Sequence, residues 1–323
     1  MDRDALDSLD LDKLVFEPLD SRPSKVHLTD LGKPCDRNVT IDAWIESLPN
    51  QLAAKGLRSL RNAIVRTKEN GKHVAAALGG HVIKTGCAPY LIDWIERGVL
   101  DSVAMNGAAA IHDLELAIAG KTSEDVGPRL MAGTFGFAHE TSDLYARAAA
   151  RAASNGLGLG YALADVIVEQ GGPGLDSSLL VAARRKGIPL TVHVAVGTDI
   201  VHMTPQLDGG ALGKATLDDF RTFCEVVASL EGGVWLNLGS AVVMPEVFLK
   251  AVSIVRNLGR SLDNMTAANL DFNQQYRGLL NVLQRPGAEG IALTGHHELM
   301  IPLLHAAVAC RLKPSPLGRS DMK

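Results

Sequence analysis

The stretch HVAAALGG, residues 73–80, decides the fold of this chain of 323 residues. An uninterrupted apolar run of this length that ends at two glycines is typical of a strand buried on both faces of a parallel sheet. A second such run, residues 100–105, ends at Asn106-Gly107, and a helical pattern around Trp94 separates the two runs. Strand, glycine turn, helix and strand is the order expected of a parallel sheet with crossover helices.

The same alternation continues toward the C-terminus. Apolar residues at helical spacing predict helices over residues 41–64, 110–119, 147–153, 178–186, 217–230 and 247–258. Further short apolar runs predict strands over residues 190–196, 233–238 and 290–293. The sequence therefore predicts an α/β fold with a doubly wound, mostly parallel sheet of Rossmann type. Its segments are an N-terminal arm (1–40), one domain (41–313) and a C-terminal tail (314–323).

Composition and charge exclude several classes of protein. Hydrophobic residues make up 46% of the chain, and the aromatic share of 4% leaves the core to aliphatic side chains. The net charge is −4 without a block of Lys and Arg, so we expect no nucleic-acid partner. No apolar run reaches the roughly 18–20 residues of a spanning helix, and the acidic start lacks a secretory signal. We therefore expect no membrane partner and a cytoplasmic location. The scattered cysteines predict reduced thiols: Cys35, Cys87, Cys224 and Cys310.

Glycines at the ends of three predicted strands indicate a nucleotide site. The turns are Gly79-Gly80 followed by Thr85-Gly86, Asn106-Gly107, and Gly239-Ser240. Ligands of parallel sheets bind outside the carboxyl ends of the strands, where glycine lets the backbone approach a phosphate closely. A glycine after a strand also serves an ordinary turn, so it is the three turns together that favour a nucleotide. No GxGxxG pattern follows the first strand, which disfavours a standard Rossmann dehydrogenase.

The order of these motifs resembles that of the deoxyhypusine synthase family. That family has a strand, a Ser-Gly turn and a helix, then a strand that ends in a Thr-Thr-Gly-Ala or similar turn with a following His-Asp. Similar segments run in the same order here: Lys84-Thr85-Gly86, Asn106-Gly107-Ala108, Ile111-His112-Asp113, Thr198-Asp199, Leu238-Gly239-Ser240-Ala241-Val242-Val243 and Gly287-Ala288-Glu289-Gly290. The resemblance covers roughly residues 40–300 and rests on order and spacing.

The resemblance implies a cofactor, an activity and an assembly. Family members bind NAD at these turns and transfer an aminobutyl group from spermidine; a lysine carries the fragment covalently between oxidation and reduction. Members form tetramers with sites between subunits, which implies a homo-oligomer here, with the polar arm packed on the body or on a neighbouring subunit. Together with the glycine turns, the resemblance gives these cofactor-binding candidates: Gly79, Thr85, Gly86, Asn106, Gly107, Ala108, Asp199, Gly239 and Ser240.

This chain departs from the family pattern at the positions of the family's catalytic lysine and histidine. The family lysine lies in a Trp-Gly-Lys segment after the last strand, where this chain has GHHELM, residues 295–300, and no lysine before Lys313. The family's catalytic histidine falls near Pro245-Glu246, and an additional segment, residues 259–286, has no family counterpart. Because a Schiff base needs a desolvated lysine amine, we expect a reaction other than deoxyhypusine synthesis.

His296, His297 and Glu298 form the sharpest polar cluster, directly after a predicted strand. A histidine there acts as an acid or base near neutral pH, and Glu298 orients it or binds a cationic amine. The alternative is that one histidine caps the following helix and the other is exposed. A zinc site would need a further ligand such as His202, and the segment is not HExxH. We take these four residues as catalytic candidates and predict no metal site.

Polar residues near other strand ends supply further candidates. Residues 269–277 lie in the additional segment, and long insertions at the ligand edge are often lids. Asp271 and Arg277 are therefore candidate substrate contacts, with a plain surface helix as the alternative. Asp199 and His202 follow a predicted strand, which favours their placement in the ligand site.

Three functional hypotheses remain open at this point. The first is a NAD-dependent transferase or oxidoreductase, similar to deoxyhypusine synthase, that oxidises a small amine or polyamine-like substrate with or without transfer of an alkyl group. The second is a non-catalytic NAD-binding or assembly protein, because the family's lysine and histidine are missing. The third is a metal-dependent hydrolase that uses the His-His-Glu cluster.

Overall fold

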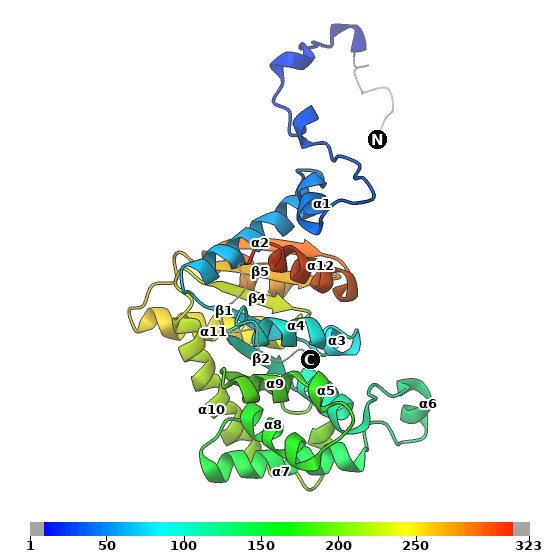
Figure 1. Ribbon diagram of the computed structural model, residues 1–323, viewed down its shortest axis with the longest axis vertical. Coiled ribbons are helices and arrows are strands. Elements are labelled where there is room, and N and C mark those ends of the chain that lie inside the picture. The colour runs from blue at the N-terminus through cyan, green and yellow to red at the C-terminus, as the bar shows by residue number, and fades with distance from the viewer. Residues whose placement is uncertain (1–9, 313–323) are drawn as a thin grey trace, which may run out of the picture.

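A six-stranded sheet with the order β3-β2-β1-β4-β5-β6 forms the centre of the molecule in the computed structural model, which describes residues 10–312 (Figure 1). Lys313 and the predicted tail 314–323 lie outside the described residues, as do residues 1–9. The strands are β1 (Val74–Leu78), β2 (Ser102–Asn106), β3 (Leu190–His193), β4 (Val234–Leu238), β5 (Thr266–Asp271) and β6 (Glu289–Thr294). Every neighbouring pair is parallel. The predicted α/β fold with a parallel sheet is confirmed.

Helices cover both faces of the sheet, so the fold is doubly wound (Figure 1). One face carries α2 (Leu52–Glu69), α3 (Gly80–Lys84), α4 (Ala88–Glu96), α5 (Gly107–Ala119), α9 (Leu179–Lys186) and α12 (His297–Ala309). The other carries α10 (Gly209–Ala228), α11 (Val243–Asn257) and the π-helix η7 (Gly278–Gln284). The side chains of β1 alternate between the two apolar cores: Val74, Ala76 and Leu78 join one core, whereas Ala75 and Ala77 join the other. Small side chains in β1 suit a strand covered closely on both faces.

The β3 edge of the sheet is covered by α8 (Leu159–Gln170) and α10, and α7 (His139–Asn155) packs on both of these helices. From α10, Oδ2 of Asp219 accepts hydrogen bonds from the N–H groups of Val192 (2.8 Å) and Gly160 (2.9 Å). The hydroxyl of Thr216, also on α10, donates to the carbonyl oxygen of Val192 at 2.9 Å. Burial raises the pKa of Asp219 to about 7. Backbone groups on the outer side of β3 are thus bonded to side chains of a helix.

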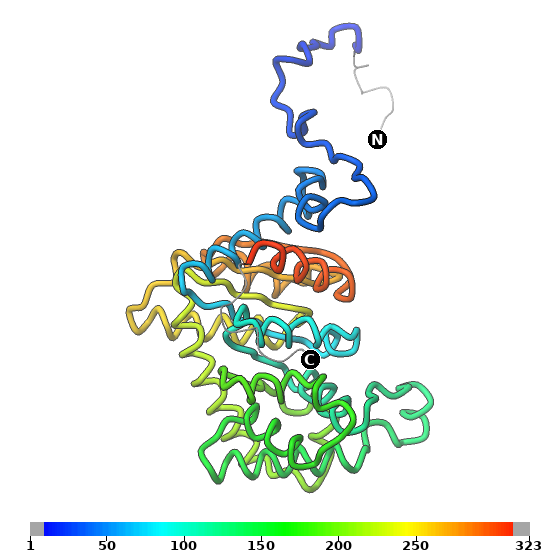
Figure 2. The backbone as a smooth tube through the Cα atoms, viewed as in Figure 1, coloured from blue at the N-terminus to red at the C-terminus, as the bar shows by residue number. Residues whose placement is uncertain are grey.

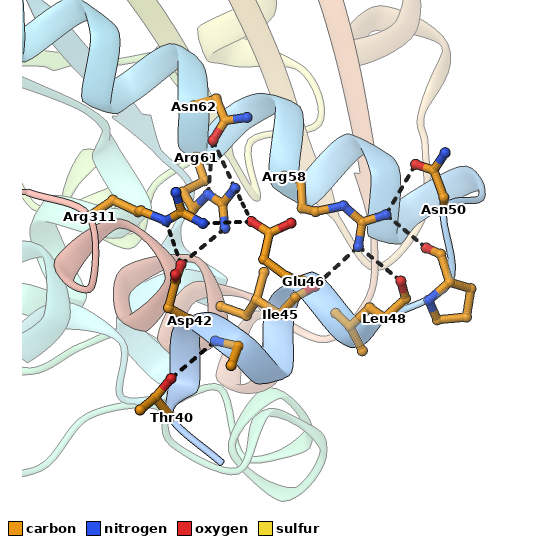
Figure 3. Close-up of polar contacts among 12 residues, drawn as sticks. Thr40, Asp42, Ile45, Glu46, Leu48, Asn50, Arg58, Arg61, Asn62 and Arg311 are labelled. Carbon is orange, nitrogen blue, oxygen red and sulfur yellow. Dashed lines mark hydrogen bonds and ion pairs between the residues drawn. The ribbon is translucent and has the colours of Figure 1, made fainter. Parts of the chain in front are cut away.

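The N-terminal arm runs away from the body, as the dark blue tube in Figure 2 shows. No residue from 10 to 40 is buried, and the only regular elements of that stretch are the 3-10 turns η2 (Leu11–Lys13), η3 (Leu19–Ser21) and η4 (Leu28–Asp30). A short helix, α1 (Ile41–Ser47), connects the arm to α2 (Figure 3).

Two arginines of α2 fasten α1 to the body (Figure 3). The guanidinium of Arg58 donates to the carbonyl oxygens of Ile45, Leu48 and Pro49, at 3.1, 3.1 and 3.0 Å. Arg58 thus binds the C-terminal end of α1 and the two residues that follow it. The buried Arg61 donates to Glu46 of α1 at 2.7 Å.

One prediction about organisation is wrong. Residues 259–286 are not an inserted lid, because they contain β5, which lies inside the sheet between β4 and β6, and η7, which packs on one face. The sequence of β5, TAANLD, does not have the continuous apolar run that predicts a buried strand, because polar residues flank its apolar centre. Asn269 and Asp271 are nevertheless buried, at 1% and 5% exposure. Their polar partners come from other elements, which the strand pattern alone does not reveal.

Candidate functional site

Two of the predicted glycine turns meet where the strand order reverses, between β1 and β4; we call this place the switch point. Ligands of such sheets bind at the carboxyl ends of the strands around this position. The N–H of Gly79 donates to the carbonyl oxygen of Leu238 at 2.9 Å. A Cβ on Gly79 would lie 2.0 Å from the carbonyl oxygen of Gly239, whose own φ is +63°. Only glycine at both positions allows the two turns to touch in this way.

His297, the first residue of α12, packs its ring against the switch point. A Cβ on Gly239 would lie 2.8 Å from Nε2 of His297. The same Nε2 lies 3.3 Å from the carbonyl oxygen of Leu270 and 3.9 Å from Oδ1 of Asp271, at the end of β5. His297 is only 1% exposed, and its Nδ1 has no hydrogen-bond partner. The structure thus brings two predicted site residues, His297 and Asp271, together with Gly239.

The surroundings of His297 favour a neutral ring with a free lone pair. Burial lowers the pKa of the imidazole below its ordinary value, and the carboxylate of Asp271 opposes that effect. Because the carbonyl oxygen of Leu270 accepts only, the proton of the neutral ring belongs on Nε2. Nδ1 is then an unpaired acceptor. Chemically, this atom is placed to take a proton.

The other two members of the His-His-Glu cluster are exposed to solvent. The side chains of His296 and Glu298 are 71% and 48% exposed, and Nδ1 of His296 lies 4.0 Å from Oε1 of Glu298. His296 occupies the N-cap position of α12 without making a side-chain capping bond. The structure therefore separates His297, which is buried, from its two exposed neighbours in the sequence.

Two aromatic rings that the sequence did not single out complete this part of the site. His81 lies on α3 just after β1, and Phe272 follows β5. Their ring centroids are 5.6 Å apart, and the ring of His297 lies 5.4 Å from His81 and 6.3 Å from Phe272. The only sequence signal was position, because each residue comes within three positions of a strand end.

The third glycine turn brings together two predicted cofactor residues from distant parts of the chain. Oδ1 of Asn106 accepts from the N–H of Ala109 at 2.9 Å and so caps α5. A Cβ on Gly107 would lie 2.0 Å from Oδ2 of Asp199. The carboxylate of Asp199 therefore rests against the first turn of α5, where the helix dipole favours a negative charge.

Asp199 and His202 present an unpaired acceptor and an unpaired donor. Nδ1 of His202 accepts from the N–H groups of Gly197 (3.1 Å) and Asp199 (3.2 Å), so the proton of the neutral ring is on Nε2. This Nε2 and Oδ2 of Asp199 have no partner and lie 4.0 Å apart, although the two side chains are only 6% and 7% exposed. Burial raises the pKa of Asp199. A ligand hydroxyl could donate to Asp199 and accept from His202.

The remaining predicted contacts have mainly structural partners. The hydroxyl of Thr85 donates to the carbonyl oxygen of His81 at 2.9 Å, at the end of α3, and Gly86 follows with φ +77°. Ala108 lies in the first turn of α5 and packs against Gly80. A Cβ on Gly80 would lie 3.2 Å from the Cβ of Ala108.

Ser240 and Arg277 likewise bond to neighbouring helices. The hydroxyl oxygen of Ser240 accepts from the N–H of Met244 at 3.2 Å, at the start of α11. Arg277 pairs with Glu246 of α11 at 3.0 Å, and Glu246 also accepts from Asn281 of η7. Arg277 thus belongs to an ion-pair cluster on the α11 side of the sheet, whereas Asp271 lies beside His297.

A ladder of buried amides supports the turn after β4. Nδ2 of Asn237 donates to Oδ1 of Asn269 at 2.6 Å and to the carbonyl oxygen of Ser240 at 2.9 Å. Nδ2 of Asn269 in turn donates to Oε1 of Gln274 at 2.8 Å. The ladder links β4, β5 and the segment after β5, and so fixes the positions of Gly239 and Phe272 relative to each other.

Comparisons with known proteins identify the fold. No protein-family model matches the sequence, and no curated protein matches it. A protein from Entamoeba histolytica, provisionally described as a deoxyhypusine synthase, superposes with a TM-score of 0.53 at 11% identity, over 88% of this chain and 98% of that chain. A conserved protein from Methanococcus maripaludis, provisionally described as LOR/SDH, superposes with a TM-score of 0.51 at 13% identity, over 90% and 75%. At these identities the likeness establishes a shared α/β fold.

Two further features concern residues 10–312 only. No group of three or more His, Cys, Asp or Glu in this part of the chain is arranged to hold a metal ion. None of the helices there is long and apolar enough to cross a membrane.

Proposed function

We propose that this chain is a NAD-dependent enzyme, related in design to deoxyhypusine synthases, that oxidises a small amine or polyamine-like substrate. The observation that carries this proposal is the buried, neutral His297 beside Gly239 and Asp271 at the switch point. The order of motifs that resembles the deoxyhypusine synthase family supports it. The fold shared with the Entamoeba histolytica protein is consistent with it.

The residues around both glycine turns suit a dinucleotide. Gly79 and Gly239 hold the two turns against each other at the switch point, and dinucleotides bind at this position in sheets of this type. Oδ2 of Asp199 and Nε2 of His202 are an unpaired acceptor and donor, as the hydroxyls of a ribose require. An acidic side chain that binds ribose hydroxyls is common in folds of this type. When bound, NAD would accept a hydride from the carbon that carries the amine.

The chain's own residues would supply the proton transfer. As the C–H bond breaks and the C=N bond forms, the substrate nitrogen loses a proton, and Nδ1 of His297 is the free acceptor for it. The carboxylate of Asp271, 3.9 Å from Nε2, stabilises the imidazolium that results. Water would then hydrolyse the imine to a carbonyl compound with release of the amine. Alternatively, a second amine would attack the imine carbon and expel the first amine, and return of the hydride from NADH would reduce the new imine to the alkylated amine.

The lysine that would carry the fragment covalently is missing from residues 295–300. Direct attack of an acceptor on the imine needs no such residue. We therefore propose amine oxidation, with or without alkyl transfer, and not the synthesis of deoxyhypusine.

Mass spectrometry of the native protein, followed by NADH fluorescence with a panel of polyamines and diamino acids, tests the proposal. We expect NAD to be released from the native protein or to bind to it, and at least one amine to yield NADH. His297→Gln should lower kcat by about 10²–10⁴-fold, the share typical of a general base, while His296→Gln, the exposed neighbour, should leave kcat unchanged. NAD binding without turnover would favour the second hypothesis, a non-catalytic NAD-binding protein, and no NAD binding would overturn both.

We also infer that the chain forms a homo-oligomer, a tetramer if it follows the family, in the cytoplasm. The arm supports this, because Val15, Phe16 and Leu28 are each at least 85% exposed, and such side chains favour burial against another subunit. The cysteines of residues 10–312 are all free, as in a reducing compartment. Light scattering that found a monomer would contradict the oligomer.

A further inference from the structure

His81 and Phe272 meet across the end of β4. His81 follows β1, Phe272 follows β5, and β4 lies between these strands in the sheet. Their rings approach to 5.6 Å between centroids, so they bridge the turn at Gly239. This bridge is made of side chains alone, between segments that are distant in the sequence.

His297 lies next to both rings and is shielded from solvent. Its ring contacts His81 edge-on at 5.4 Å and Phe272 at 6.3 Å. His297 is 1% exposed, whereas Phe272 is 55% exposed and His81 is also exposed. Two of the side chains that pack against His297 are therefore residues that themselves face the solvent.

We propose that His81 and Phe272 form a two-ring gate that must part before a ligand reaches Nδ1 of His297. The gate extends the proposed function: its catalytic role rests on His297 being the base, whereas its existence as a barrier to His297 does not.

The contacts of the two residues suit a gate that opens by side-chain rotation. No hydrogen bond within residues 10–312 holds the ring of His81. The main chain of Phe272 is held, because its N–H donates to Oδ1 of Asp271 at 2.8 Å, but its ring makes no polar contact. Exposed side chains change rotamer within nanoseconds, so such a gate opens without movement of the strands.

Chemical modification measures access to His297 directly, without cofactor or substrate. Diethyl pyrocarbonate transfers an ethoxycarbonyl group to an unprotonated imidazole nitrogen, and peptide mass spectrometry locates the modified residue. Because burial lowers the pKa of His297, its ring is neutral at pH 7 and reacts whenever the reagent arrives. The exposed His296 provides an internal reference.

In the wild-type protein we expect slow modification of His297 relative to His296. If the open state is a minor state, populated at roughly 0.1–10%, Phe272→Ala should raise the rate at His297 by about tenfold or more, and His81→Ala should raise it as well. The matched control is Tyr276→Ala, which removes an exposed aromatic ring four residues away and should change nothing. Circular dichroism shows whether each variant is folded; if Phe272→Ala is not, His81→Ala decides.

Two results would overturn the gate: equal rates at His297 and His296 in the wild-type protein, or an unchanged rate at His297 in the folded gate variants. Neither result depends on NAD or on turnover. A failure of the gate is therefore distinguishable from a failure of the proposed function.

Discussion

Oδ2 of Asp199 lies where a side chain on Gly107 would begin, 2.0 Å from the position of a Cβ. The two residues are far apart in the sequence, and their contact places a buried carboxylate at the start of α5. This contact gives a direct test of the cofactor site.

Gly107→Ala should displace the Asp199 carboxylate and weaken NAD binding by about tenfold, or 1.4 kcal/mol. The stability of the fold should fall as well, because the buried Asp199 carboxylate has to move away from the new methyl group. Isothermal titration and urea unfolding measure the two effects. The control is Gly213→Ala in α10, where a Cβ would meet nothing within 4 Å. Equal NAD affinities in both variants would contradict the assignment of Asp199.

The pH dependence of kcat/KM should reflect the depressed pKa of His297. A base must be unprotonated to act, and burial keeps His297 unprotonated below the ordinary histidine pKa of roughly 6.5. With an amine that yields NADH, we expect protonation of His297 to leave kcat/KM unchanged as the pH falls to about 6.5. It should lower kcat/KM only below that value. A profile whose acid limb had its midpoint clearly above the ordinary value would speak against His297 as the base.

His193, at the end of β3, should contribute to acid sensitivity. Burial lowers its pKa to about 3, so the folded state holds a neutral ring that the unfolded chain would protonate below roughly pH 6.5. The stabilisation is complete above that pH and is lost as the pH falls toward about 3. Between pH 7 and pH 5, the free energy of unfolding should therefore fall less in His193→Phe than in the wild-type protein. The difference should be up to about 1.4 kcal/mol per pH unit. Urea midpoints of both proteins at the two pH values check this, and parallel changes would refute it.

Arg58→Met should loosen the junction between the arm and the body. It removes the donor for three carbonyl oxygens at the end of α1, and hydrogen bonds to charged groups contribute about 1.5–3 kcal/mol each at most. We expect faster proteolysis before residue 52 and a lower urea midpoint. Arg66→Met, an exposed position on the same helix, is the control and should resemble the wild-type protein.

Asn237→Leu should destabilise the fold by about 1–3 kcal/mol, since Oδ1 of Asn269 and the carbonyl oxygen of Ser240 lose their donor in a dry environment. The double variant Asn237→Leu/Asn269→Leu should cost less than the sum of the single changes, because one removed partner no longer leaves the other unsatisfied. Denaturant unfolding of the four proteins gives the coupling. Strict additivity would show that the ladder does not act as a unit.

The sheet was predictable because its signals are local. Apolar runs such as residues 74–78, each followed by glycine, require nothing beyond the sequence to be recognised as buried strands. β5 was missed because it contains two buried polar residues, Asn269 and Asp271. Asn269 is hydrogen-bonded to Asn237 and Gln274, and Asp271 lies beside His297 at the switch point. Those partners become visible only when the strands are side by side.

The site was predictable in its turns and less so in its side chains. Glycine at 79, 107 and 239 marks close approaches that only the backbone can make. Whether His296 or His297 is buried depends on the residue at which α12 begins. Two adjacent histidines do not reveal that residue. His81 and Phe272 are ordinary residues in the sequence and acquire their relationship through the order β1-β4-β5.

The bonds that α10 makes to the outer side of β3 have a consequence for assembly. A strand from another molecule cannot add to that edge without displacing Asp219 and Thr216 from the backbone of Val192. Stacking of sheets from many chains into a continuous ribbon is therefore blocked at the β3 end. Any strand-to-strand joining of two molecules is directed to the opposite edge, at β6.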